Sequence, residues 1–227
     1  MKQLSRRTLM AGLAAGAVGG TLGGNVVAHA AGERKQALKT YPNEHFYTNG
    51  VFDVEKAKAA YYEMMEYYHH PIGPRLKGEE FWAIDFGMGK FTEIGMAGIF
   101  WVNNLEDNYF GHEIYLLPGQ SIPEHSHVAT AAAGPKMEAW QLRNGSVTLY
   151  SEGEPSPGVE KRIPPTHLEC AKARKEQQLT ESGEMGQLAA AGQWHWMKAG
   201  PNGAIVTEYA TYHDGEGLRF SHPDVKF

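Results

Sequence analysis

The spacing of hydrophobic and polar positions changes along the chain, and its first regular stretch is helical. Between residues 53 and 68 the apolar positions fall on one face of a helix: Ala57, Ala60, Tyr61, Met64, Met65 and Tyr68. We expect Asp53 to cap this helix and His69-His70-Pro71 to end it. A helix C-terminus favours histidine electrostatically, so this pair is better explained there than as metal ligands.

From residue 81 onward, short apolar or alternating runs are separated by turn residues, which is typical of β-strands. The predicted strands cover residues 81–86, 97–102, 109–117, 137–142, 146–150, 194–198 and 204–212. Asn144-Gly145 predicts a hairpin between two of them, because both residues adopt positive φ at low cost. The segment 152–183 is expected to be a loop with one helical turn in 170–179. This pattern predicts an all-β sandwich or jelly roll with an N-terminal helix.

The N-terminus has the pattern of an export signal. Arg6-Arg7 precedes a Gly- and Ala-rich, weakly hydrophobic run and then Ala28-His29-Ala30, a cleavage signal of the A-x-A type. A membrane anchor would need about 20 strongly hydrophobic residues. We therefore expect a signal peptide at 1–30, carried by the twin-arginine export machinery to the periplasm, and no membrane span in the mature chain. An N-terminal extension at 31–80 and a main domain at 81–227 would follow.

Composition excludes some classes of function. The formal net charge is −5, which makes nucleic acid an unfavourable partner. Cys170 is the only cysteine, so the chain cannot form an internal disulfide. Nothing near Cys170 in the sequence supplies a positioned base, so a structural role is favoured over a catalytic thiol.

The stretch PGQSIPEHSHVATAAAGPKMEAW, residues 118–140, carries candidate metal chemistry. His125 and His127 alternate along an extended strand and so project from the same face, as two ligands of one metal would. The chain has 11 histidines, so this pair alone is weak evidence. Its frame strengthens it: Gly119 precedes the pair, Glu138 follows on the next strand, and Gly145 comes after Glu138.

A second Gly-led segment, Gly192-Gln193-Trp194-His195, adds a third imidazole. Either His195 closes the site from a neighbouring strand, or it belongs to an aromatic cluster between two tryptophans. With His195, three neutral imidazoles and one carboxylate would bind a divalent metal. Nitrogen and oxygen donors without thiolate suit Mn, Fe, Co, Ni or Zn.

These two half-motifs resemble those of the cupins, and within the cupins the chain is similar to the D-lyxose isomerase family. The resemblance runs through AIDFGMGKFTEIG, PGQSIPEHSH, KMEAWQLRNGSVTLYSEGE, HWMKAG and GAIVTEYATYHDGEGLRFSHPDVKF. It implies a double-stranded β-helix, also called a jelly roll. It also implies a metal-dependent enzyme that interconverts an aldose such as D-lyxose with its ketose through an enediol.

The resemblance implies roles for individual residues. The metal ligands would be His125, His127, Glu138 and His195, with manganese as the usual ion. Glu208 would be the base that moves the proton, and Lys136 would interact with a sugar oxygen. Further residues are expected to contact the sugar: Trp140, Trp194 and Asp214.

The chain departs from the family near its C-terminus, where Leu218 and His222 replace expected acids. These departures bear on the identity of the sugar more than on metal binding. Two other functions therefore stay open: a non-catalytic periplasmic cupin that binds carbohydrate or metal, and an iron-dependent oxygenase. Whether the protein forms a homodimer is left open too.

Overall fold

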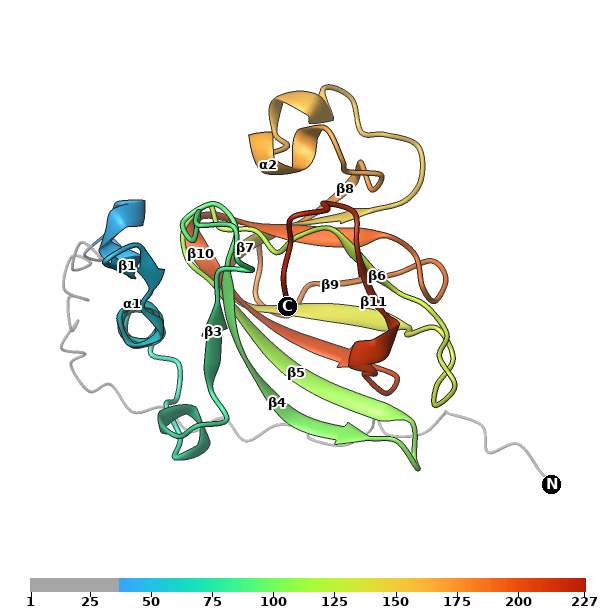
Figure 1. The fold of residues 1–227 in the computed structure, drawn as a ribbon, viewed down its shortest axis with the longest axis horizontal. Helices are drawn as coiled ribbons and strands as arrows, with labels where there is room; N and C mark the ends of the chain where they lie inside the picture. The colour runs from blue at the N-terminus through green and yellow to red at the C-terminus, as the bar shows by residue number, and fades with distance from the viewer. Residues whose placement is uncertain (1–36) are drawn as a thin grey trace, which may run out of the picture. The chain divides into compact units, whose positions relative to one another are not determined.

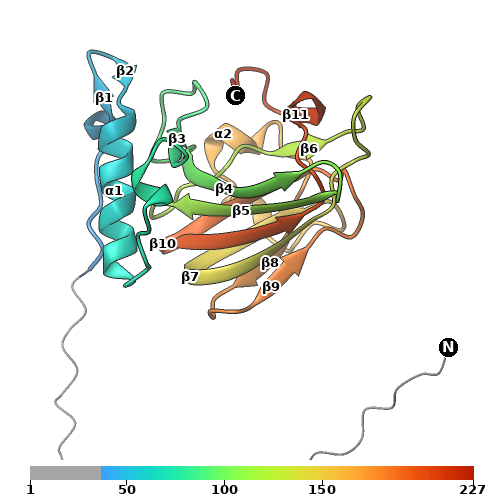
Figure 2. The same ribbon diagram turned by 90° about the horizontal axis from the view of Figure 1, so that it is seen from below.

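A curled antiparallel sheet forms the body of the computed structural model, which describes residues 37–227. Its long strands lie side by side in Figure 2: β4 (Met96–Asn104), β5 (Tyr109–Leu116), β7 (Glu138–Ser151) and β10 (His195–Ala210). Its short strands are β3 (Trp82–Ile84), β6 (His125–His127), β8 (Lys175–Leu179), β9 (Met185–Gln187) and β11 (Leu218–Phe220). The order is β11-β6-β10-β5-β4-β3, and β7 pairs with β10, β8 and β9. The sheet curls around an interior (Figure 1), which confirms the expected cupin jelly roll.

Alternation along the strands gives the sheet two buried faces. Ile114 and Leu116 of β5 belong to the core inside the curled sheet, whereas Tyr115 between them belongs to a second core on the outer face. Val206 and Ile205 of β10 divide in the same way. Successive side chains of a strand point to opposite faces, so β5 and β10 are covered on both sides.

Helix α1 (Val54–Tyr67) covers the outer face. Asp53 caps it by accepting a hydrogen bond from the Lys56 amide at 3.2 Å, as expected. The predicted apolar face is confirmed, because Ala57, Ala60, Tyr61, Met64 and Met65 are all buried. Figure 2 shows α1 standing beside the sheet, packed against it by these residues.

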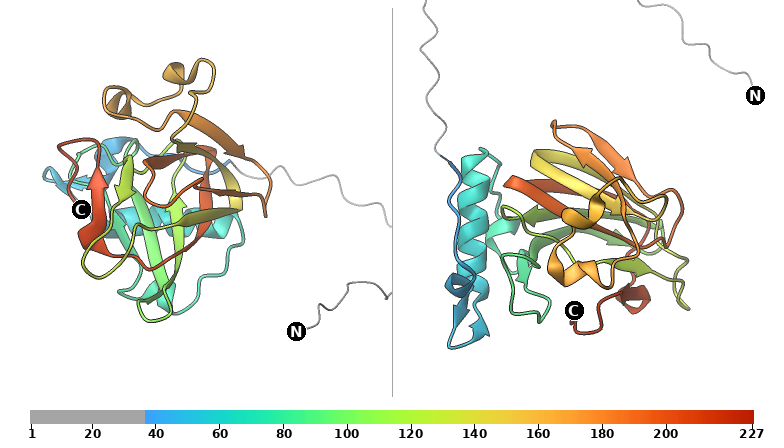
Figure 3. Two further views of the ribbon diagram at one scale, coloured as in Figure 1. Left: turned by 90° about the vertical axis from the view of Figure 1, so that its right-hand side faces the viewer. Right: turned by 90° about the horizontal axis from the view of Figure 1, so that it is seen from above.

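The remaining elements are short. Before and after α1 lie η1 (Asn43–Phe46), β1 (Tyr47–Thr48), β2 (Val51–Phe52) and η2 (Arg75–Lys77). Later in the chain lie η3 (Val159–Lys161), α2 (Pro165–Leu168) and η4 (Gly215–Gly217). Figure 3 shows α2 at one side of the sheet. No helix within residues 37–227 is long and apolar enough to cross a membrane. The expected signal peptide lies outside the described residues.

The predicted hairpin at Asn144-Gly145 is wrong, because β7 continues through both residues to Ser151. Gly145 does have a positive φ of 79°, but it serves an irregularity in the pairing of β7 with β10. A Cβ atom on Gly145 would lie 2.1 Å from the carbonyl oxygen of Gly203 on β10. The two strands approach so closely at this point that only glycine fits. The two strands predicted at 194–198 and 204–212 are, in the structure, a single strand, β10.

The helical turn predicted within residues 170–179 is also wrong. Residues Lys175–Leu179 form β8, which pairs with β7 from Ser151 to Val147. Leu179 is buried in the interior core. A local preference for helix is weaker than these pairings and this burial, so the segment is extended. The helical turn lies earlier, at α2.

Candidate active site and metal centre

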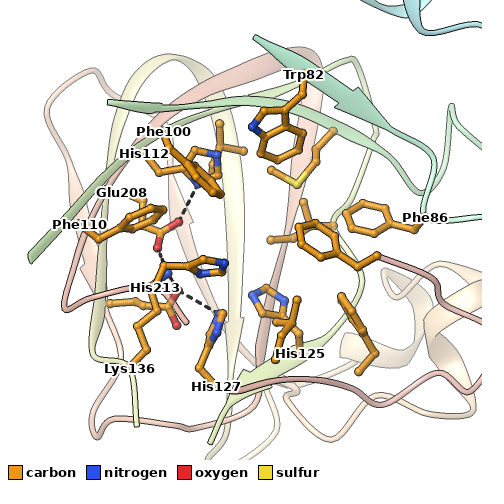
Figure 4. A pocket seen from close by; sticks show the side chains of 17 residues that line it. Trp82, Phe86, Phe100, Phe110, His112, His125, His127, Lys136, Glu208 and His213 are labelled. Atoms are coloured by element: carbon orange, nitrogen blue, oxygen red, sulfur yellow. Dashed lines mark hydrogen bonds and ion pairs between the residues drawn. The ribbon is translucent and has the colours of Figure 1, made fainter. Parts of the chain in front are cut away.

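The curled sheet surrounds a cavity whose volume, including its open mouth, is about 470 Å³. Strands β3, β4, β5, β6, β7, β10 and β11 all contribute side chains to its lining (Figure 4). Alternation explains which residues of one strand face it. On β5 these are Phe110, His112 and Ile114, each two residues from the next.

The four expected metal ligands meet at one end of this cavity. His125 and His127 lie on β6, and His195 of β10 is the register partner of His125. Glu138 begins β7, directly opposite Ala210 of β10. One ligand atom from each of these four residues lies within 4.8 Å of the others. The structure therefore brings together a group predicted from positions 70 residues apart in the sequence.

Backbone carbonyls orient two of the imidazoles. Nδ1 of His125 lies 2.9 Å from the carbonyl oxygen of Pro123, and Nδ1 of His195 lies 2.8 Å from that of Gln193. Each carbonyl accepts a hydrogen bond from a protonated Nδ1, so Nε2 carries the free lone pair. This is the arrangement in which metal-binding histidines are usually held.

The free atoms of the group fit a metal. Nε2 of His195 and Oε2 of Glu138 are 3.1 Å apart, yet neither atom has a hydrogen-bond partner among the described residues. Buried polar atoms without partners are costly, and a cation shared by both would remove that cost. Burial also lowers the pKa of His125 to about 3, aided by the nearby His195, so its imidazole is neutral and able to ligate.

Lys136 connects this group to a second carboxylate. Lys136 and Glu138 are two residues apart and both face the interior, where Nζ donates to Oε1 of Glu138 at 2.9 Å. The same ammonium donates to Oε1 of Glu208 on β10. All three side chains are almost fully buried. Two expected catalytic residues and one expected ligand thus form a single ion-paired chain.

The charged groups in this set of ion pairs stabilise one another's ionised forms. Burial is the largest influence on Glu208 and tends to raise its pKa, but the Lys136 ammonium together with His112 lowers the pKa to about 2. Burial likewise tends to lower the pKa of Lys136, and Glu208 and Glu138 together raise it above its ordinary value. At neutral pH both carboxylates are therefore ionised and the lysine is charged.

His112 is a member of the site that the sequence analysis missed. It lies opposite Glu208 on β5, and its Nδ1 is 3.1 Å from Oε2 of Glu208. Trp82 stacks on its ring at 5.7 Å between centroids. A Cβ atom on Gly98 would lie 2.3 Å from Nε2 of His112, so only glycine admits this imidazole. Because Phe110, His112 and Ile114 are spaced two residues apart on one strand, the sequence could have predicted that His112 faces the interior with the two apolar residues.

His213 is the other polar residue that the sequence analysis did not place here. Its ring stacks on Phe110 at 5.3 Å and meets the ring of His127 edge-on at 5.2 Å. Asn103 exchanges two hydrogen bonds with its backbone. Burial, together with the Lys136 charge, lowers the pKa of His213 to about 4, so its imidazole is neutral.

The rest of the cavity lining is apolar. Its aromatic members are Trp82, Phe86, Phe100, Phe110, Phe220 and Phe227. Its aliphatic members are Met96, Ile114, Ile122 and Leu218. Leu218, where the resemblance led us to expect an acid, therefore faces the cavity directly. His222, the other departure, is outside the lining and accepts a hydrogen bond from the Asp224 amide.

Three residues expected to contact the sugar are not in the lining. Trp140 lies behind His195, with 5.2 Å between ring centroids, and is buried in the interior core. The ring of Trp194 packs under the Lys172 ammonium at 3.7 Å. Asp214 accepts hydrogen bonds from Thr130 and from the amide of Glu216. In this structure Trp140 and Trp194 pack against other side chains and Asp214 caps η4, and contact of these three residues with a sugar stays a prediction.

Comparison with known proteins places these features in a family. No family model matches the chain. The D-lyxose/D-mannose isomerase of Thermosediminibacter oceani is 32% identical over 173 residues, which cover 76% of this chain and 93% of that protein. The D-lyxose ketol-isomerase of Cohnella laeviribosi is 35% identical over 142 residues, covering 63% and 76% of the two chains.

Solved structures share the fold. The L-ribose isomerase of Cellulomonas parahominis superimposes with a TM-score of 0.59 at 12% identity, covering 76% of this chain and 92% of that chain. The L-ribose isomerase of Acinetobacter sp. DL28 gives a TM-score of 0.52 at 15% identity, covering 70% and 78%. These structures show the cupin fold, and the sequence relatives show that this chain belongs to the D-lyxose ketol-isomerase family and is a sugar isomerase.

Proposed function

We propose that the protein is a metal-dependent isomerase that interconverts an aldose of the D-lyxose type with its ketose. The observation that carries this proposal is the chain of ion pairs from Glu138 through Lys136 to Glu208, inside one cavity. A protein that only binds sugar or metal has no need of a buried base held beside the ligand group. Relatives named as isomerases favour catalysis over the binding protein and the oxygenase.

The reaction moves one proton between carbons and one between oxygens. In the aldose-to-ketose direction a base removes the hydrogen on C2, an enediol forms, and a proton is delivered to C1. The proton on O2 is transferred to O1, so the sugar's composition is unchanged. Glu208 is ionised and faces the cavity, which suits it to take the C2 proton and return it to C1.

A divalent metal would be held by His125, His127, Glu138 and His195, with manganese as our first choice. When bound, such an ion acts as a Lewis acid that stabilises negative charge on the sugar oxygens. The neighbouring Lys136 carries three N–H donors and contacts two carboxylates, so it can turn one donor towards a sugar oxygen.

Lys136 and His112 would also control the strength of the base. A carboxylate with a pKa near 2 is a weak base, so the lysine must weaken its contact with Glu208 for proton transfer to be efficient. Donation from Lys136 to the sugar oxygen would do this at the moment the negative charge develops there. His112 would hold the Glu208 carboxylate in place meanwhile.

We also propose that residues 1–30 direct export by the twin-arginine route, on the basis of Arg6-Arg7 and Ala28-His29-Ala30. We expect the mature protein to begin at Ala31 and to be recovered from the periplasm. Mass spectrometry of the exported protein tests the cleavage site. An intact Met1, or unchanged export of an Arg6→Lys, Arg7→Lys double variant, would contradict the proposal.

Metal content tests the ligand group. We expect His125→Ala, His127→Ala, His195→Ala and Glu138→Gln each to lower metal affinity at least ~10-fold, because four ligands act together on one ion. The measurement is elemental analysis of protein dialysed against buffered metal, with circular dichroism to confirm folding. His213→Ala is the matched control, because His213 lines the same cavity without belonging to the group. Loss of metal in the control, with metal retained in His195→Ala, would show that the assignment is wrong.

Exchange of the C2 hydrogen tests the base. Glu208→Gln keeps the shape of the side chain but not its basicity, so turnover should fall by roughly 10²- to 10⁴-fold while metal stays bound. The rate is read by NMR from deuterium incorporation in deuterated water, with a diamagnetic metal or after metal removal. The exposed Glu181→Gln serves as the control. Unchanged exchange in Glu208→Gln would remove Glu208 from this role.

The pH profile tests the pairing of Lys136 with Glu208. Without the ammonium, burial is the dominant influence, so the pKa of Glu208 should rise from about 2 to above its ordinary 4.5. Because the base works only when ionised, Lys136→Gln should show a new acid limb in kcat/KM that wild type lacks above pH 4.5. Residual C2 exchange, measured against pH, supplies the profile. Lys136→Arg keeps the charge and should keep the profile flat; identical profiles for Lys136→Gln and wild type would refute the pairing.

A further inference from the structure

The cavity has two chemically different sides, visible in Figure 4. On one side lie Glu208, Lys136 and His213, beside the ligand His127. Phe100 and Phe110 are labelled on this side too, whereas Trp82 and Phe86 lie on the other side, with the ligand His125 below them. A substrate held with its C1–C2 end between the ligand group and Glu208 must extend the rest of its carbon chain past the remaining lining.

That remaining lining offers few polar partners. Once the ligand group, Glu208 and Lys136 are set aside, the side-chain nitrogen and oxygen atoms in the lining belong to His112, His213 and Trp82, and of the two His112 nitrogens only Nε2 has no partner among the described residues. An open-chain aldohexose carries four hydroxyls beyond O2, and an aldopentose carries three. With one partner each from His112, His213 and Trp82, at least one hydroxyl of an aldohexose would gain no side-chain partner, and an aldopentose would need all three, which is unfavourable where the hydroxyl also loses water.

The apolar side is a built surface. The rings of Phe86, Phe220 and Phe227 lie 6.1–6.2 Å from one another, and Phe220 lies 6.1 Å from the ring of His125. Phe220 belongs to β11, which pairs with the ligand strand β6. The Lys226 amide donates to the Phe86 carbonyl at 2.9 Å, which holds the chain next to Phe227 against the Phe86 segment. We call these three rings the aromatic wall.

The aromatic wall is suited to packing against the apolar C–H groups of a substrate. Aromatic rings do pack against the C–H faces of sugars, but the hydroxyls around such a face still need partners at the edge of the ring. Leu218, which precedes Phe220 by two residues on β11 and also lines the cavity, supplies none, and the neighbouring His125 belongs to the ligand group. Phe227 is 62% exposed, so an apolar group on the substrate would bury aromatic surface that water otherwise covers.

We propose that the preferred substrate is a terminally deoxygenated aldose, in which a methyl group replaces the hydroxymethyl group farthest from the carbonyl. A 6-deoxyhexose or a 5-deoxypentose belongs to this class. The inference rests on the proposed isomerisation, because that reaction fixes which end of the sugar meets the ligand group. The methyl end then packs on the aromatic wall, and His213 and Trp82 serve the hydroxyls between.

Matched sugars that differ by one terminal hydroxyl test this inference. The pairs are 6-deoxy-D-mannose with D-mannose, 5-deoxy-D-lyxose with D-lyxose, and 5-deoxy-L-ribose with L-ribose. We expect kcat/KM to be roughly 10- to 100-fold higher for the deoxy member of each pair that reacts, the scale on which apolar pockets discriminate against an added hydroxyl. Equal values, or a preference for the hydroxylated member, would overturn the inference and leave the isomerisation standing.

A variant of the cavity provides the converse test. Leu218→Asn puts a donor and an acceptor next to the aromatic wall at nearly constant size, so the preference for the deoxy sugar should fall about 10-fold or more. The exposed Leu105→Asn is the matched control and should keep the wild-type preference. If Leu218→Asn folds, binds metal and also keeps that preference, the wall does not determine it.

Binding of sugars that cannot isomerise separates this inference from the proposed function. D-mannitol and 6-deoxy-D-mannitol lack the carbonyl, and calorimetry measures their affinities directly. We expect the deoxy compound to bind about 10-fold more tightly, since the same wall receives it. That preference, without C2 exchange in any aldose, would overturn the isomerisation and keep the recognition of a terminal methyl. Equal affinities for the two alditols, together with normal C2 exchange in an aldose, would overturn the recognition of a terminal methyl and keep the isomerisation.

Discussion

The buried ammonium of Lys136 is the interaction on which the site depends. It is 3% exposed and contacts the carboxylates of Glu138 and Glu208. An unpaired charge in this position would be strongly unfavourable, and removing one partner of such a buried pair typically costs about 3–5 kcal/mol. Each of the three groups is therefore held in its charged form by the others. The candidate ligand Glu138 and the proposed base Glu208 contact the same ammonium, so their positions cannot vary independently.

Strand β10 gives these groups their geometry. Near its start His195 faces His125 of β6, and near its end Glu208 lies opposite His112 of β5. Along the other edge of β10 runs β7, whose first residue is Glu138. A ligand, the base and its orienting imidazole are thus fixed by backbone pairing to one strand. The close approach at Gly145 and Gly203 keeps β7 and β10 together where their registers differ.

The sequence predicts the parts of the site that depend on local alternation. The shared face of His125 and His127 follows from strand geometry, and the return of Glu138 and His195 follows from the order of strands. The hairpin prediction failed because Asn144-Gly145 signals positive φ, which a bulge within a strand uses as readily as a turn does. Trp140 lies outside the cavity lining for a related reason. Alternation tells which face a residue takes but not whether another side chain covers it.

The features missed in the sequence are set by contacts between distant segments. His112 gains its role from Glu208, 96 residues later, and from the space left by Gly98. The rings of Phe86 and Phe220 approach across more than half the chain, and no local period connects their positions. Alternation along a strand can be read from the local sequence. Which side chains of different strands contact one another is seen only in the folded sheet.

The apolar lining and the buried ion pairs reinforce each other. Water near Lys136 would screen its attraction to Glu208 and would compete for its donors, whereas Phe110 lies under the ammonium with its ring centre 4.4 Å from Nζ. With weak screening, a small movement of the lysine changes the basicity of Glu208 by a large factor. A polar lining that bound every sugar hydroxyl would also bring water to these charges. In the proposed mechanism, the same apolar rings would limit hydroxyl recognition and keep water away from the ion pairs, which would link the choice of sugar to the strength of Glu208 as a base.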